Sequence, residues 1–243
     1  MKKLMIAAAA ICAVAGAWAI ESANVVGYET QNIVDGDINM KGFNFEATDG
    51  TSLSLNDLTG TGMSMSDDEA EADQVKLWNN GGYITFAYFS DEGGTWFDVA
   101  GDAEPVINPG QSFWYVSYGT GVSGKNIRLA GALVNDSDVT INLVNGDINM
   151  IVNPYPASFN MNNTAQVQWI QCTMSDDEAE ADQIKVWNNG GYLTFAYFSD
   201  EGGTWFDVAG DEEAVVPSGA GFWFVAYDAD DGASKKIKFI RPY

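Results

Sequence analysis

Histidine is missing altogether from this chain of 243 residues. It is the side chain that most often serves as a general base and as a ligand for transition metals. Its absence excludes Ser-His-Asp and Cys-His catalytic arrangements and argues against a zinc site. Glycoside hydrolysis needs only two carboxylates, but the acids of this chain cluster in expected turns and no feature places one of them in an apolar pocket. We therefore expect no enzymatic activity.

Cysteine is nearly absent, with only Cys12 and Cys172 in the whole sequence. Two lysines near the start, an apolar run over residues 4–14 and small residues at positions 17 and 19 are typical of a cleaved export signal. We predict a signal peptide at residues 1–19 and an exported protein located outside the cell, on its surface or in the periplasm. The mature chain then holds one cysteine and no internal disulfide, so packing alone must stabilise it.

Long apolar runs and basic residues are also scarce. After the first run, no stretch is long enough and apolar enough to span a bilayer as a helix. The chain has 11 Lys and Arg residues against 34 Asp and Glu residues, which gives a net charge of −23. Such a surface repels nucleic acids and anionic membranes and suits divalent cations or cationic partners. We expect neither a nucleic-acid partner nor a membrane span.

A long internal repeat is the main feature that the sequence does contain. Residues 66–102 and 175–211 are identical at all but three of 37 positions, and each difference exchanges one apolar residue for another. The offset of 109 residues indicates a tandem duplication. We predict a first unit over residues 20–133 and a second unit over residues 134–243, each long enough to bury its own core.

Short apolar and aromatic segments, separated by turns rich in Gly, Asn and Asp, are typical of strands. We expect strands near residues 24–34, 74–78, 83–90, 95–99, 111–118 and 126–130, with the last two of the second unit near 221–227 and 236–240. The pattern predicts an all-β fold of two tandem antiparallel β-sandwich-like units, or alternatively barrel-like units. Several strands are apolar on both faces, so one face needs cover from a second layer, the other unit or a ligand.

Three motifs carry a resemblance to a known group of proteins. They are ESANVVGY at residues 21–28, DQVKLWN at residues 73–79 and NPGQSFW at residues 108–114. Together they resemble the uncharacterised exported tandem-repeat β-rich proteins of Verrucomicrobia- and Lentisphaerae-like bacteria. The second copy departs from the last motif at residues 217–219, where the Pro-Gly pair is interrupted. The resemblance implies export and a β-rich architecture, and it implies no catalytic residues.

An acidic run occurs near the start of each repeat. Its carboxylates repel one another, and a hard cation such as Ca²⁺ would relieve that repulsion because it takes oxygen ligands. The sequence therefore predicts calcium sites in two clusters: Asp67, Asp68, Glu69, Glu71 and Asp73, and Asp176, Asp177, Glu178, Glu180 and Asp182. The alternative is a solvated acidic segment. Ser66 and Glu69 match a capping box, which predicts one short helical turn over residues 67–72.

Aromatic side chains are the other candidates for a site. Eight of them, repeated in the two units, have flat faces that stack on sugar rings: Trp78, Tyr83, Trp96, Trp114, Trp187, Tyr192, Trp205 and Trp223. Two linked sites of this kind would bind a polysaccharide with avidity. The alternative is that these side chains fill the cores and the contact between the units.

Basic residues gather at the ends of the units, whereas the acidic runs lie nearer the middle. The basic residues are Lys125, Arg128, Lys235, Lys236, Lys238 and Arg241. A basic strand that faces an acidic surface favours head-to-tail contact between chains. The sequence thus favours a non-catalytic, self-assembling structural protein of the cell surface or extracellular space, stabilised by Ca²⁺ and associating with itself or with other surface components. The alternative function is carbohydrate binding, with polysaccharide as the partner of two repeated aromatic sites.

Overall fold

The structure is a computed structural model, and it describes residues 26–48, 50–79, 81–101, 103–188, 190–210, 212–228 and 234–243. The predicted signal peptide lies outside these residues. The prediction of an all-β fold is confirmed, since 48% of the described residues are in strands and 4% are helical. The helical elements of the described ranges are three 3₁₀ turns, η1 (Leu55–Asp57), η2 (Glu69–Glu71) and η3 (Glu178–Glu180).

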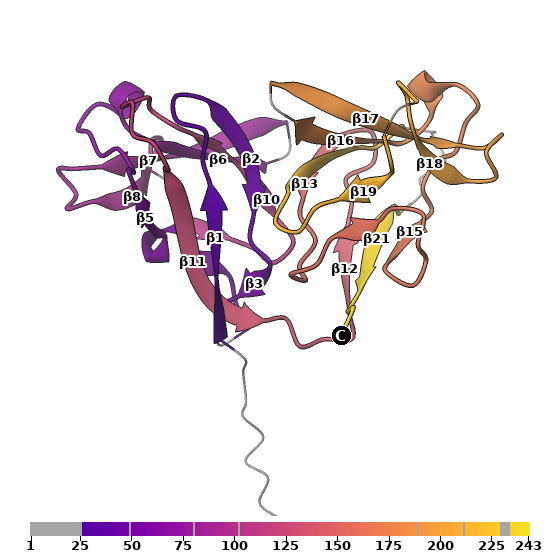
Figure 1. The fold of residues 1–243 in the computed structure, drawn as a ribbon, viewed down its shortest axis with the longest axis horizontal. Coiled ribbons are helices and arrows are strands. Elements are labelled where there is room, and N and C mark those ends of the chain that lie inside the picture. Colours follow the sequence, from indigo (N-terminus) through magenta and orange to yellow (C-terminus); the bar gives the residue numbers. More distant parts are fainter. Residues whose placement is uncertain are drawn as a thin grey trace, which may run out of the picture.

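The first half is built around two antiparallel sheets (Figure 1). The larger sheet has the strand order β2-β10-β6-β7-β8, and the smaller one joins β1, β3 and β5 to the long strand β11. A separate pair consists of β4 and β9. The strands are β1 (Val26–Asn32), β2 (Ile38–Gly42), β3 (Phe45–Glu46), β4 (Leu53–Ser54), β5 (Thr59–Thr61), β6 (Gln74–Asn79), β7 (Gly82–Phe89), β8 (Thr95–Asp98), β9 (Val106–Ile107), β10 (Ser112–Val116) and β11 (Asn126–Leu133).

The second half has a main sheet of the same design, with the strand order β13-β20-β16-β17-β18. A three-stranded sheet, β12-β21-β15, accompanies it, and β14 pairs with β19. The strands are β12 (Asp138–Asn142), β13 (Ile148–Ile151), β14 (Phe159–Asn160), β15 (Val167–Ile170), β16 (Gln183–Asn188), β17 (Gly191–Phe198), β18 (Thr204–Asp207), β19 (Val215–Val216), β20 (Phe222–Val225) and β21 (Lys236–Ile240). The small antiparallel sheets of the whole chain are arranged like a four-bladed propeller.

Each half has its own hydrophobic core, to which both of its main sheets contribute. In the first half, Leu129 of β11 belongs to the same buried cluster as Phe86 of β7 and Phe113 of β10. In the second half, Phe239 of β21 and Phe222 of β20 occupy one cluster. Alternate residues of a strand point to opposite faces, so each strand sends one set of side chains into its core.

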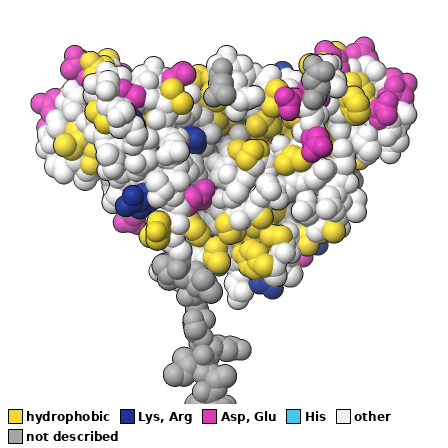
Figure 2. Space-filling view, viewed as in Figure 1, with side chains coloured by type: hydrophobic (Ala, Val, Ile, Leu, Met, Phe, Trp, Pro, Cys, Tyr) yellow, Lys and Arg dark blue, Asp and Glu magenta, His cyan; other side chains and the backbone are white. Residues whose placement is uncertain are grey.

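The other face of each main sheet meets the opposite half along a seam with approximate twofold symmetry. Lys41 on β2 pairs with Ala220 of the second half through an isolated β-bridge. Ile151 on β13 pairs with Gln111 of the first half in the same way. Figure 2 shows hydrophobic side chains gathered between the two lobes and acidic side chains at their outer ends. Several strands are apolar on both faces, and the neighbouring half therefore covers part of the face that does not point into the strand's own core.

Tryptophans dominate this seam. Trp78 packs edge-on against Trp223 with ring centroids 5.8 Å apart, and Trp187 packs edge-on against Trp114 at 5.5 Å. The two pairs are equivalent under the approximate twofold axis, because β6 corresponds to β16 and β10 to β20. Met40 and Met150 complete the buried part of the cluster. The seam is thus an apolar core shared by the two halves.

Candidate functional site

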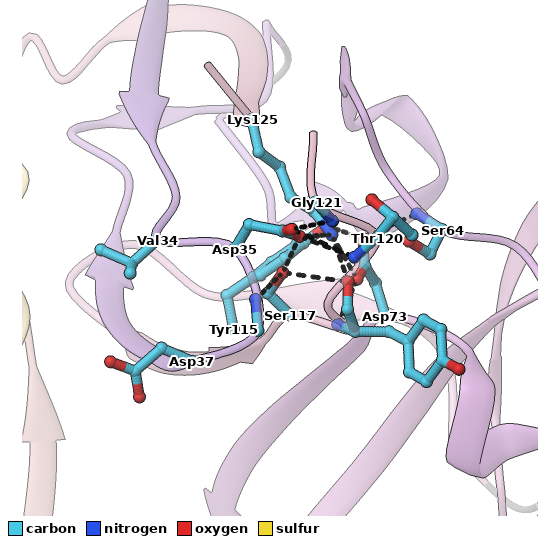
Figure 3. Close-up of polar contacts among 12 residues, drawn as sticks. Val34, Asp35, Asp37, Ser64, Asp73, Tyr115, Ser117, Thr120, Gly121 and Lys125 are labelled. Atoms are coloured by element: carbon cyan, nitrogen blue, oxygen red, sulfur yellow. Dashed lines mark hydrogen bonds and ion pairs between the residues drawn. The ribbon is translucent and has the colours of Figure 1, made fainter. Parts of the chain in front are cut away.

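The last aspartate of each acidic run is buried and already paired, which corrects the prediction that it binds calcium. Asp73 is 0% exposed, and its carboxylate accepts hydrogen bonds from the Lys125 ammonium (2.7 Å), the Tyr115 hydroxyl (2.6 Å) and the backbone amides of Ser64 and Tyr118 (2.9 and 2.8 Å). Figure 3 shows how these groups converge from separate segments of the chain. No lone pair of this carboxylate is left for an ion.

The second half repeats this buried ion pair with different surroundings. Asp182 accepts from Lys235 at 2.6 Å and from the amides of Thr173 and Tyr227, both at 2.8 Å. Phe224 occupies the position of Tyr115, so the phenolic hydrogen bond exists only in the first half. There, burial raises the pKa of Tyr115, and the adjacent Asp73 carboxylate raises it further. In both halves the ion pair joins the residue before the last strand of the unit to the residue before β6 or β16.

The remaining acids of the two runs lie on exposed 3₁₀ turns. The predicted helical turn is present, but the capping box is wrong, because Asp68 is the N-cap and accepts from the Ala70 amide at 2.9 Å. The Ser66 hydroxyl accepts instead from the Asp68 amide at 3.1 Å. Within the described ranges no three acidic or cysteine side chains converge on a point where an ion would sit. A calcium site at these turns stays a prediction.

The eight aromatic candidates separate into three environments. Trp96 and Trp205 are only 1% exposed and lie in the two cores, where no ligand reaches them. Trp114 and Trp223 are 6% exposed and belong to the seam. The half-buried or exposed aromatics at the border of the seam are Trp78, Trp187, Tyr83 and Tyr192. Only these four are accessible to a ligand.

A groove of about 610 Å³ runs along the seam on the side of β1 and β2, and we call it the seam groove. Strands β1 and β2 provide one wall, with Glu29, Gln31 and Lys41 among its residues. The other wall comes from the second half, where Trp187 and Asn188 form the end of β16 and residues 217–220 precede β20. The groove therefore combines both halves of the chain, and it is the site that the geometry favours for a ligand.

The polar groups of the seam groove are incompletely paired. Gln31 is 8% exposed, and its Nε2 donates to Glu29 Oε1 (3.0 Å) and to the Gly42 carbonyl (2.5 Å). Its Oε1 is buried and has no hydrogen-bond partner. The Lys41 ammonium lies near Glu29, but among the described residues it forms no ion pair. A buried acceptor without a donor costs about 1–3 kcal/mol, and a donor from the groove reaches this oxygen when the Gln31 side chain turns outward.

Burial also shifts the pKa of both charged groups in the groove. It raises the pKa of Glu29, partly opposed by hydrogen bonds from the Asn44 amide and Gln31 and by the charge of Lys41. It lowers the pKa of Lys41, which Glu29 partly opposes. Both shifts arise because the groove withdraws the groups from water, and low polarity disfavours the charged forms.

A second groove occupies the equivalent place across the approximate twofold axis, and we call it the counterpart groove. It has a volume of about 250 Å³ and is lined by Trp78 of the first half together with Ile141 and Ile151 of the second. The strand registers identify the equivalent residues. Gln31 pairs with Ile127 in the first half, and Ile141 pairs with the corresponding Ile237 in the second half. Glu29, Gln31 and Lys41 thus correspond to Val139, Ile141 and Ile151. All three polar residues of the seam groove are therefore replaced by apolar residues in the second half.

Comparison with known proteins gives no family for the chain. No family model, no curated protein and no solved structure matches it. No helix in the described part of the chain has the length and apolar character that crossing a bilayer requires.

Proposed function

We propose that this chain is an exported, non-catalytic carbohydrate-binding protein, formed by duplication of a two-sheet, sandwich-like unit, with its ligand in the seam groove. The observation that carries the proposal is the lining of the seam groove, which combines Trp187 with Gln31, whose Oε1 has no partner, and with Lys41, which forms no ion pair among the described residues. Ligand sites typically combine an aromatic or apolar wall with a few convergent polar groups.

Sugar hydroxyls fit these groups because each hydroxyl both donates and accepts a hydrogen bond. A hydroxyl in the groove accepts from the Lys41 ammonium, and a second one donates to Gln31 Oε1 once the Gln31 side chain turns toward the ligand. The indole of Trp187 offers an apolar surface with a polar N–H, and such a surface suits a sugar ring that is apolar on one face.

Replacing Gln31 by isoleucine, the residue at the equivalent position of the other half, tests the acceptor. We expect a loss of affinity of about tenfold or more, because the sugar hydroxyl loses its partner. Affinity electrophoresis in native gels that contain dextran, mannan, soluble starch or hydroxyethylcellulose measures it. Ile141→Val in the counterpart groove is the matched control and keeps full affinity. Equal binding by Gln31→Ile and the unaltered chain contradicts the proposal.

Two equivalent glycines provide a second matched pair. Gly219 and Gly110 have φ of +71° and +79°, so alanine at either position costs about 1–2 kcal/mol of backbone strain. An added Cβ at Gly219 collides with the Glu29 carboxylate, whereas one at Gly110 collides with Ile141. We expect both alanine variants to unfold at lower denaturant concentration, and only Gly219→Ala to weaken binding in the same gels. Equal weakening by both would show that the effect is general.

Alkaline pH tests the part played by Lys41. Because burial lowers its pKa, this ammonium loses its proton at a lower pH than exposed lysines do, and affinity is expected to fall there. Stability shows the opposite sign: the unfolded chain holds this proton more tightly, so its contribution to stability rises with pH across that window. Lys41→Arg keeps its charge and is expected to bind independently of pH. The same alkaline fall in Lys41→Arg would exclude Lys41 as its cause.

Self-assembly at the cell surface is the second candidate function, favoured by one observation. Phe97 on β8 and Phe206 on β18 are both 49% exposed, and these two edge strands lie at opposite ends of the molecule (Figure 1). The basic charges predicted to drive assembly are reduced, however, because Lys125 and Lys235 are buried. The edge of β18 is also capped: the Asn162 side chain accepts from the Trp205 amide (2.8 Å) and donates to its carbonyl (2.9 Å), and such capping opposes strand pairing between chains.

Light scattering with and without millimolar Ca²⁺ separates this candidate from the first. Assembly predicts polymers that require Ca²⁺ and disappear in the double variant Phe97→Ser/Phe206→Ser. A monomer under both conditions rejects assembly and leaves the binding proposal intact.

A further inference from the structure

We infer that the seam groove takes an uncharged saccharide, that each chain binds one such ligand, and that the counterpart groove takes none. This inference rests on the proposed function and specifies its ligand and stoichiometry. It replaces the expectation of two equal aromatic sites, because the polar residues Gln31 and Lys41 of the seam groove are replaced by isoleucines in the counterpart groove.

The charges of the seam groove favour a neutral ligand. Its lining includes the carboxylates of Glu29 and Asp37 but only one cationic side chain, Lys41. An acidic sugar would gain one attraction there and meet two repulsions, in a chain whose net charge is −23. An uncharged hydroxyl instead accepts from the Lys41 ammonium and leaves the partial compensation between Lys41 and Glu29 undisturbed.

The single stoichiometry follows from the counterpart groove. There Ile141 and Ile151 replace the buried amide and the ammonium, so no side chain at either position accepts or donates a hydrogen bond. The available space is also smaller, about 250 Å³ against about 610 Å³. A sugar placed there would give up hydrogen bonds with water and gain none from these two positions, which opposes binding. The lining does contain amide side chains, but those of Asn108, Gln111 and Asn149 are already hydrogen-bonded within the chain.

Isothermal titration tests ligand class and stoichiometry together. Neutral gluco-, manno-, galacto- and xylo-oligosaccharides are compared with oligogalacturonate of the same length, at low and high salt. We expect one bound neutral ligand per chain, with an affinity that salt leaves unchanged. We also expect Lys41→Ile to lower that affinity about tenfold, whereas Lys41→Gln, which keeps a donor, retains more of it. Circular dichroism confirms that both variants are folded.

Three other results of the titration would each contradict a different part of the proposal. Tighter binding of oligogalacturonate that weakens with salt overturns the inference about charge, while the proposed function stands. Two neutral ligands per chain overturn the inference about the counterpart groove and again leave the function in place. Binding of none of these saccharides overturns the proposed function and the inference with it.

Discussion

Replacing Lys125 by methionine destabilises the fold by about 3–5 kcal/mol, because it leaves the Asp73 carboxylate charged, buried and without its cation. Both side chains of this pair are 0% exposed, and the pair joins the segment before β11 to the segment before β6. Water cannot replace the lost ammonium at so closed a site. Urea unfolding followed by tryptophan fluorescence measures the change.

Two further variants separate the ion pair from a general effect of losing lysine. The double variant Asp73→Asn/Lys125→Met removes both charges and is expected to recover part of the loss, because an uncompensated buried charge is the larger penalty. Arg128→Met, on the exposed face of β11, should change stability by no more than about 0.5 kcal/mol. If Lys125→Met unfolds at the same urea concentration as Arg128→Met, Lys125 does not hold this part of the fold.

Truncating the seam tryptophans is the second change with a large expected effect. Trp114→Ala or Trp223→Ala removes a side chain that is 6% exposed and contacts the opposite half, at an expected cost of about 3–5 kcal/mol. The double variant is expected to unfold in two transitions, since each half keeps its own core while the shared core is lost. It should also lose ligand binding, because the seam groove takes its walls from both halves.

Calorimetry and denaturant unfolding together measure this effect. Tyr28→Ala is the matched control, since this aromatic residue of β1 is 73% exposed and contributes little to either core. A single transition at unchanged stability in the double tryptophan variant would show that the seam does not couple the halves.

The strand pattern could be predicted from the sequence because it is a local property. Strands expected at residues 74–78, 83–90 and 236–240 occur as β6, β7 and β21 with boundaries within one residue. Alternating apolar residues and glycine-rich turns specify such elements without reference to the rest of the chain. The irregular segment between β2 and β6 was harder, because its short strands depend on β9 and β11, which lie much later in the sequence.

The site was harder to predict because it depends on contacts between distant segments. In the sequence, Asp73 resembles the four acids before it, and only the approach of Lys125 distinguishes it from them. Glu29, Gln31 and Lys41 were overlooked for the same reason, since the residues opposite them come from the second half. A signal was nevertheless present in the sequence. The first unit has the polar residues Gln31 and Lys41 at positions where the second unit has Ile141 and Ile151.

The most direct test of the binding account is a crystal structure of the chain soaked with the neutral oligosaccharide that binds most tightly in titration. We predict one sugar in the seam groove, stacked on Trp187, with one hydroxyl on the Lys41 ammonium and a second one on Gln31 Oε1. An oligosaccharide bound elsewhere, for example on the exposed rings of Tyr83 and Tyr192 with the seam groove empty, would contradict it.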